Sequence, residues 1–239
     1  MPVGKFALSA ALLVFCSVAS AAIIVAPIDG ATSYTVQQII DAGGIKIGDK
    51  TFTEWRVTTT TQGNGIAPQA GGISVTGVQI SGEYGMRFNG PWSASTGDLA
   101  DTTIGFRVTA DDPWLICDNT LAVAAFGADK GGMASISENV YAADPTKVFS
   151  SPVANKYVYY VNDTNYKAVD HKEFPSDYKD IWVVKDVIVN GSTAVGATAH
   201  VSEFYQTFSQ IPEPATLSLL VVGAVLTLAR PRHRHTNTR

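Results

Sequence analysis

Residues 103–109 read Thr-Ile-Gly-Phe-Arg-Val-Thr, so Ile104, Phe106 and Val108 alternate with polar residues and glycine. Successive side chains of a β-strand point to opposite faces of a sheet, and this period of two therefore predicts a strand with one buried face. Between residues 23 and 210 the sequence has no apolar stripe that continues over three helical turns. We therefore expect strands to build the whole domain.

Further runs of alternating or β-branched and aromatic residues follow along the chain, at 52–57, 73–80, 157–161, 181–189 and 197–208. Glycine, proline, asparagine and aspartate separate these runs, and the Asn-Gly pair at 190–191 is typical of a hairpin turn. Short helical turns are expected only at 34–40 and 142–148. About ten short strands without intervening helices predict an all-β fold, a single β-sandwich of jelly-roll type.

The composition excludes several classes of protein. The chain has 239 residues, a net charge of −4 and 16% charged residues, below the roughly 25% of typical soluble domains. This balance argues against a disordered acidic tail, and it lacks the basic excess of a nucleic-acid binder. Two cysteines are too few for a disulfide-rich scaffold or a cysteine-rich zinc module. The length fits one domain with a sizeable core.

The first 21 residues have the pattern of a secretory signal peptide. A basic residue precedes an apolar run that is too short to span a bilayer stably, and small residues follow, ending at Ala21. We expect signal peptidase to cleave after Ala21 or Ala22. The mature chain then keeps a single cysteine, Cys117, which cannot form an internal disulfide and is interpreted as a small buried hydrophobe.

The C-terminal segment has three parts in a fixed order. Pro212-Glu213-Pro214 comes first, an apolar run over 216–229 follows, and an arginine-rich end closes it with Arg230, Arg232 and Arg234. About 15 apolar residues are marginal for a bilayer core of about 30 Å, so the predicted helix would hold the protein only transiently. The arginines are expected to stay cytoplasmic by the positive-inside rule. A plain C-terminal anchor is the alternative interpretation, and in either case the domain faces outward.

This order of motifs resembles the PEP-CTERM sorting signal of exported bacterial proteins. The resemblance implies that an exosortase cuts near Pro-Glu-Pro, after an intermediate held in the inner membrane. It also implies a host that makes exopolysaccharide. The expected organisation is a signal peptide over 1–21, a β-sandwich domain over 22–210, a sorting signal over 211–234 and a tail over 235–239. The expected destination is the cell surface or the extracellular matrix.

Sequence motifs for enzymatic chemistry are weak. His171 and His200 lie about thirty residues apart with no cysteine pair, which argues against zinc. The chain has no Gly-x-Ser-x-Gly nucleophile motif. We therefore expect no enzyme. Paired-carboxylate glycosidases carry no local sequence signature, so a polysaccharide-active hydrolase stays open as an alternative.

Acidic loops make calcium the better candidate ion. Asp98 and Asp101 lie three residues apart in one such loop, and Ca²⁺ takes oxygen ligands from loops of this kind. They are therefore the candidate calcium ligands, although the same residues are also typical of ordinary turns.

Aromatic residues suggest sugar binding, because exposed rings can stack on the faces of pyranoses. Trp92 lies in a Gly/Pro/Ser segment and is expected to be exposed, and Trp114 is the second candidate. Trp55 and Trp182 lie within predicted strands and are expected in the core. Four tyrosines would form a flat platform or half-buried packing: Tyr157, Tyr159, Tyr160 and Tyr166.

Together these features predict a structural or adhesive protein of the exopolysaccharide layer. The first alternative is a lectin-like carbohydrate-binding module, in which bound calcium could assist the binding. The second is a polysaccharide-active hydrolase. The expected partners are signal peptidase, an exosortase, the membrane in transit, and extracellular polysaccharide.

Overall fold

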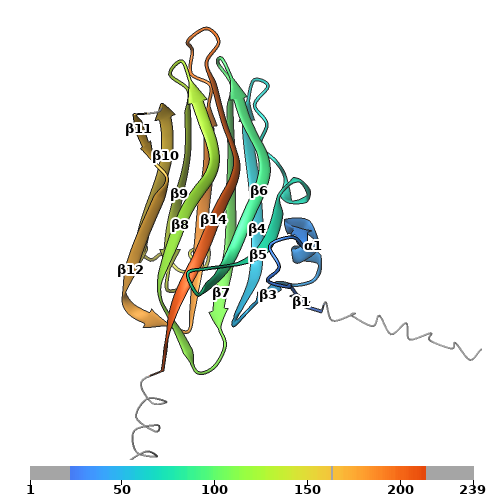
Figure 1. Cartoon of the computed structure of the whole chain (residues 1–239), viewed down its shortest axis with the longest axis vertical. Coiled ribbons are helices and arrows are strands. Elements are labelled where there is room, and N and C mark those ends of the chain that lie inside the picture. Colours follow the sequence, from blue (N-terminus) through green and yellow to red (C-terminus); the bar gives the residue numbers. More distant parts are fainter. Residues whose placement is uncertain (1–21, 163, 214–239) are drawn as a thin grey trace, which may run out of the picture.

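A computed structural model describes residues 22–162 and 164–213 of the chain. They form two β-sheets whose strands run along the long axis of the molecule (Figure 1). The predicted β-sandwich is confirmed, and its jelly-roll subtype stays a prediction. Within these residues no helix is long and apolar enough to cross a membrane.

The two sheets have eight and six strands. The order in the eight-stranded sheet is β1 (Ile24–Val25), β3 (Ile45–Ile47), β4 (Lys50–Gln62), β7 (Leu99–Ala110), β13 (Asp180–Asn190), β9 (Met133–Tyr141), β10 (Ala154–Asn162) and β11 (Asn165–Lys167). The order in the six-stranded sheet is β12 (Val169–Tyr178), β8 (Trp114–Asp129), β14 (Thr198–Pro212), β6 (Glu83–Ser95), β5 (Ser74–Ile80) and β2 (Ser33–Thr35). Neighbouring strands are antiparallel, except that β1 and β3 run parallel.

The alternation that predicted the central strands also determines which side chains enter the core. Every second residue of β7, from Ala100 to Ala110, is buried, and β13 follows the same pattern from Ile181 to Val189. The intervening residues of both strands point to the outer face of the eight-stranded sheet, away from the six-stranded sheet. In these two strands the outer face is therefore formed by the mostly polar residues that alternate with the buried ones.

Stacked aromatic rings fill the space between the sheets. Trp55 and Phe106 have ring centroids 4.7 Å apart within the eight-stranded sheet. Phe88 and Phe204 show the same separation in the six-stranded sheet, and Phe88 lies 6.3 Å from Phe106. Burial of each such ring stabilises the fold by about 1.5–3 kcal/mol. The expectation that Trp55 belongs to the core is confirmed.

Two short segments adopt the helical geometry expected of them. Helix α1 (Val36–Asp41) begins with a capping box, in which Thr35 and Gln38 each accept a backbone hydrogen bond from the other. Between β9 and β10 the backbone N–H of Val148 donates to the carbonyl of Asp144, which closes one turn. A short 3-10 helix, η1 (Ala70–Gly72), precedes β5.

The Asn-Gly pair after β13 does not make a hairpin. β13 belongs to the eight-stranded sheet and the next strand, β14, belongs to the six-stranded sheet, so the connection crosses the sandwich. Gly191 lies so close to β6 that a Cβ would meet the carbonyl oxygen of Ser95 at 1.7 Å. The glycine is therefore needed for close approach of two backbones, not for a two-residue turn.

The expected exposure of Trp92 is wrong. β6 continues past Pro91 to Ser95, and Trp92 is only 1% exposed. Its indole N–H donates to the Thr102 hydroxyl at 2.9 Å. Pro91 sits at an irregularity in the pairing of β6 with β14, between Val201 and Glu203. A proline that lacks an N–H is tolerated at such a bulge, so the strand passes through a sequence that resembles a loop.

The last described strand extends beyond the predicted domain boundary. β14 ends at Pro212, which pairs with Trp114, and the backbone N–H of Glu213 donates to the carbonyl of Pro113 at 2.7 Å. Ala21, the rest of the signal peptide and the C-terminal segment from Pro214 onward, with its predicted membrane helix and Arg230, Arg232 and Arg234, lie outside the described residues.

Replacement of Trp92 by alanine should lower the free energy of unfolding by about 3–5 kcal/mol, because a large buried ring is removed. Thr102→Val should cost about 1–3 kcal/mol, since the indole N–H loses its acceptor. Urea denaturation measures both values. The control is Phe149→Ala, because that side chain is 103% exposed and should shift stability by less than about 0.5 kcal/mol. Equal losses of stability in Trp92→Ala and Phe149→Ala would contradict the burial of Trp92.

Candidate functional site: a groove on the outer face of the eight-stranded sheet

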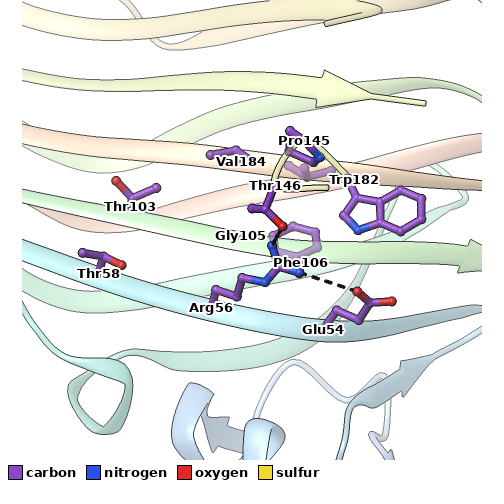
Figure 2. A pocket seen from close by; sticks show the side chains of 11 residues that line it. Glu54, Arg56, Thr58, Thr103, Gly105, Phe106, Pro145, Thr146, Trp182 and Val184 are labelled. Carbon is purple, nitrogen blue, oxygen red and sulfur yellow. Dashed lines mark hydrogen bonds and ion pairs between the residues drawn. The ribbon is translucent and has the colours of Figure 1, made fainter. Parts of the chain in front are cut away.

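A cavity of about 200 Å³ opens on the outer face of the eight-stranded sheet, over β4, β7 and β13 (Figure 2). We call it the outer groove and define it by six of its lining residues: Glu54, Arg56, Thr103, Gly105, Thr146 and Trp182. Figure 2 shows Arg56 and Glu54 on β4 lying across from Trp182 on β13. The groove therefore has two side walls and a sheet as its floor.

The floor is open because β7 carries a glycine at its centre. A Cβ built on Gly105 would find no atom nearer than 3.9 Å, where it meets Arg56 and the carbonyl of Val183. Gly105 is not among the residues with positive φ, so other residues could adopt this backbone. A glycine within a strand often marks a close approach by a ligand. A larger side chain at this position would occupy the groove.

An ion pair holds the loop between β9 and β10 over the groove. The Arg56 guanidinium lies 3.0 Å from one carboxylate oxygen of Asp144 and donates to the Thr146 hydroxyl at 2.9 Å. Asp144 is 5% exposed, and Arg56 holds the pKa of this carboxyl well below its usual range. The loop and the sheet are thus joined by charge-assisted hydrogen bonds, which fix the groove's upper edge.

Trp182 lines the groove with a partly exposed indole, which differs from the core position expected for it. Ile181 and Val183 are buried on either side, so Trp182 points to the outer face. The Arg107 guanidinium lies 4.8 Å from the ring centroid, in cation–π contact, and bonds to Asp180 at 2.7 Å. Within the described part of the chain the indole Nε1 has no hydrogen-bond partner. The ring is fixed mainly by packing and stacking.

Glu54 has an unusual backbone for its residue type. Its φ is 55°, in the left-handed region, and it lies where the register of β4 against β7 shifts. Its carboxylate lies 3.5 Å from the Arg107 guanidinium and 3.7 Å from that of Arg56. Non-glycine residues with this conformation are uncommon and often occur at binding sites. The bulge places a carboxylate between two arginines at the edge of the groove.

Two carboxyl groups adjoin the groove on the same face. Thr103 donates to Asp186 at 3.1 Å. Burial raises the pKa of Asp101 to about 6, with a further contribution from its hydrogen bond to Asp186 and from like-charge repulsion. Two such groups in contact share a proton more readily than both ionise. Asp101 therefore stays partly protonated near pH 6.

The predicted calcium ligands have different partners. Asp98 accepts the backbone N–H of Asn64 at 2.8 Å in the loop before β7, whereas Asp101 lies within β7 next to Asp186. Among residues 22–162 and 164–213, no three histidine, cysteine, aspartate or glutamate side chains group together as metal ligands would. The turn interpretation of Asp98 fits its contact with the backbone better.

The four tyrosines divide into two groups. Tyr157 and Tyr159 stack at 5.4 Å on β10, and their partners Ser137 and Ser135 on β9 place them on the outer face. Tyr160 instead contacts Phe126 of the six-stranded sheet at 5.1 Å. Half of the predicted platform therefore shares a face with the outer groove.

Trp114 is partly buried against the core at the start of β8, in the other sheet from the groove. The structure therefore does not bring the predicted residues Trp92, Trp114, Asp98 and Asp101 together in one site. Sequence reasoning missed Arg56, Gly105 and Arg107. Alternation in the sequence could have identified them. These three residues occupy positions of predicted strands that face outward, between the buried apolar positions.

Stability should depend on pH through Asp101. The folded protein holds this proton to about pH 6, while the unfolded chain loses it near pH 4. This contribution is therefore fully present below about pH 4 and is lost as the pH rises through 6. Asp101→Asn should remove that loss, so its melting temperature should rise relative to wild type between pH 4 and pH 7. The exposed Glu173→Gln is the control, and parallel curves for all three proteins would contradict the assignment.

No protein-family model matches the chain, and no curated protein sequence does. Among solved structures it is similar to TmCBM61 in complex with β-1,4-galactotriose, at 12% identity and a TM-score of 0.30, covering 65% of this chain and 89% of that one. It is also similar to the family 11 carbohydrate-binding module from Clostridium thermocellum in complex with a β-1,3-1,4-mixed-linked tetrasaccharide, at 10% identity and a TM-score of 0.22, covering 62% and 87%. A third is the enzymatically active domain of bacteriophage CBA120 tailspike protein 4, at 15% identity and a TM-score of 0.24, covering 68% and 20%. At these identities and TM-scores the likenesses concern the fold and carry no argument about function.

Proposed function

We propose that the domain binds extracellular polysaccharide in the outer groove. The observation that carries the proposal is the groove itself, in which an aromatic wall, an open glycine floor and fixed charged groups meet on one sheet. Ligand sites combine apolar and aromatic lining with a few placed polar groups in this way.

The residues suit the two kinds of surface that a sugar presents. The partly exposed Trp182 offers apolar area to a pyranose face, and the ring loses little conformational freedom because Arg107 already stacks on it. Arg56 and Glu54 lie at the opposite edge, where guanidinium donors and carboxylate acceptors can bond to hydroxyls. About 200 Å³ is below the roughly 300–1,000 Å³ of drug-sized sites. It suits a single sugar unit.

The outer face offers further contacts beyond the groove. The strand register places one row of polar side chains across five strands, comprising Thr58, Thr103, Asp186, Ser137 and Tyr157. Adjacent strands lie about 4.8 Å apart, so this row spans about 19 Å. A row of this length supports binding of an extended chain with one unit seated in the groove.

Hydrolysis is favoured less than binding by the carboxyl geometry. Asp101 and Asp186 lie on the adjacent strands β7 and β13 and influence each other's protonation. The paired carboxyls of retaining glycosidases stand about 5–5.5 Å apart, and those of inverting enzymes stand farther. Two carboxyls that lie side by side on adjacent strands of one sheet and affect each other's protonation do not have this arrangement on either side of a glycosidic bond.

Export and exosortase sorting provide the setting in this proposal. A matrix-binding domain delivered by a PEP-CTERM-type signal would act as an adhesive component of the exopolysaccharide layer. In this proposal the groove binds polysaccharide, and the sorting signal targets the protein to the cell surface.

Binding should fall at least tenfold, or about 1.4 kcal/mol, in Trp182→Ala, which removes the wall, and in Gly105→Val, which fills the floor. The measurement is retention of the purified mature protein on the host's exopolysaccharide, with β-1,4-galactotriose and a mixed-linked β-glucan as defined probes. Trp114→Ala is the matched control, since it removes the same residue type from the other sheet and should retain binding. Unchanged binding in both groove variants, with melting curves like wild type, would refute the proposal.

Replacement of Pro212-Glu213-Pro214 by three alanines should leave the protein in the membrane fraction, because the proposed processing site is lost. Fractionation of the native host with an antibody to the domain measures this. A variant with Ala at 230, 232 and 234 tests the basic end separately. Normal release of the first variant would exclude exosortase sorting.

A further inference from the structure

Five buried polar side chains lie between the two sheets. Glu138, Lys156 and Lys185 come from β9, β10 and β13 of the eight-stranded sheet, and Asn119 and Gln206 come from β8 and β14 of the six-stranded sheet. Each is at most 3% exposed. Buried polar groups of this number need mutual partners.

Glu138 lies at the centre of this cluster. Its Oε1 accepts the side-chain N–H of Asn119 at 2.7 Å and lies 2.8 Å from the Lys156 ammonium nitrogen. Its Oε2 accepts from Lys185. Lys156 also donates to Oδ1 of Asn119, and Lys185 donates to Oε1 of Gln206.

The charges in the cluster do not balance if both lysines are protonated. One carboxylate can compensate one ammonium, and an uncompensated charge in an apolar interior is expensive. Burial lowers the pKa of Lys156 to about 7 and that of Lys185 well below its ordinary value. At least one lysine is therefore a neutral amine, which is nucleophilic.

We propose that Lys156 and Asn119 join in an intramolecular isopeptide bond, with Glu138 as the catalytic residue that carries the proton. The Lys156 amine donates a hydrogen bond to Oδ1 of Asn119. The amide carbon lies only about 1.2 Å beyond that oxygen. Nucleophile, electrophile and proton carrier are thus in mutual contact and shielded from water.

The step is balanced without a co-reactant. Nζ of Lys156 forms a bond to Cγ of Asn119, and Glu138 accepts a proton from that nitrogen. The carboxyl then returns the proton to Nδ2, the Cγ–Nδ2 bond breaks, and ammonia leaves. The product is a secondary amide, and Glu138 is again a carboxylate. The same carboxylate oxygen contacts both the attacking and the leaving nitrogen, as this relay requires.

The second lysine–amide pair is less well arranged for this reaction. The leaving nitrogen of Gln206 lies 3.4 Å from Glu138 Oε1, against 2.7 Å for that of Asn119. Proton delivery to Gln206 is therefore weaker. The geometry assigns the bond to Lys156 and Asn119, and Lys185 donates to the other carboxylate oxygen of Glu138.

The test is peptide mapping of the full chain after expression and unfolding. Trypsin cleaves after Arg107, Lys130, Lys147 and Lys167. An isopeptide bond blocks cleavage at Lys156, so fragments 108–130 and 148–167 should travel as one species, lighter than their sum by one ammonia, about 17 Da. Recovery of separate fragments 108–130 and 148–156 from wild type would overturn the proposal. A crosslink mapped to Lys185 and Gln206 would overturn the assignment.

Variants identify the proton carrier. Glu138→Gln keeps the shape of the side chain but cannot accept the proton, so the crosslinked species should be lost. The control Lys179→Met removes a lysine outside the cluster and should leave it intact. A crosslink that persists in Glu138→Gln would refute the role of Glu138.

Refolding covers the case in which Glu138→Gln does not fold. Wild-type chain that is recovered in denaturant before it has ever folded should lack the crosslink, and it should release one ammonia per chain when it folds. Folding of that chain without ammonia release would also refute the proposal.

Discussion

The Glu138 carboxylate joins the two sheets, because its partners come from β10 and β13 on one side and β8 on the other. Removing one member of a buried ion pair costs about 3–5 kcal/mol, since the remaining charge has no partner. The cluster therefore opposes any slip of the strands that contribute to it. A slip of one residue would turn Lys185 outward and Asp186 inward, and would reverse both faces of β13. The position of the outer groove thus depends on a contact on the opposite side of the sheet.

Much of the fold could be predicted from alternation alone. The pattern in β7 and β13 is long and regular, and each strand follows it closely. Trp92 was missed because glycine and proline on its N-terminal side indicate a loop, whereas an irregularity in the pairing with β14 accommodates the proline within a strand. The prediction of a hairpin at the Asn-Gly pair after β13 was wrong for a related reason. Local turn chemistry does not say whether the next strand joins the same sheet.

The candidate site was harder to predict than the fold. Arg56, Gly105 and Trp182 are distant in sequence, and only the pairing of β4, β7 and β13 brings them together. The alternation could still have placed Trp182, since buried neighbours on both sides imply an outward ring. The loop at Thr146 has no such signal. Its position depends on the ion pair of Arg56 with Asp144, which no local pattern reveals.

The way in which the chain leaves the domain has a mechanical consequence. β14 runs to Pro212 and is hydrogen-bonded to β8 on one side and β6 on the other. Tension applied at the C-terminus would load this strand along its length, so the ladders on both sides would have to shear together instead of opening one bond at a time. Resistance to such force is governed by the unfolding rate more than by equilibrium stability. A domain held by its C-terminal end would therefore resist unfolding under a steady pulling force.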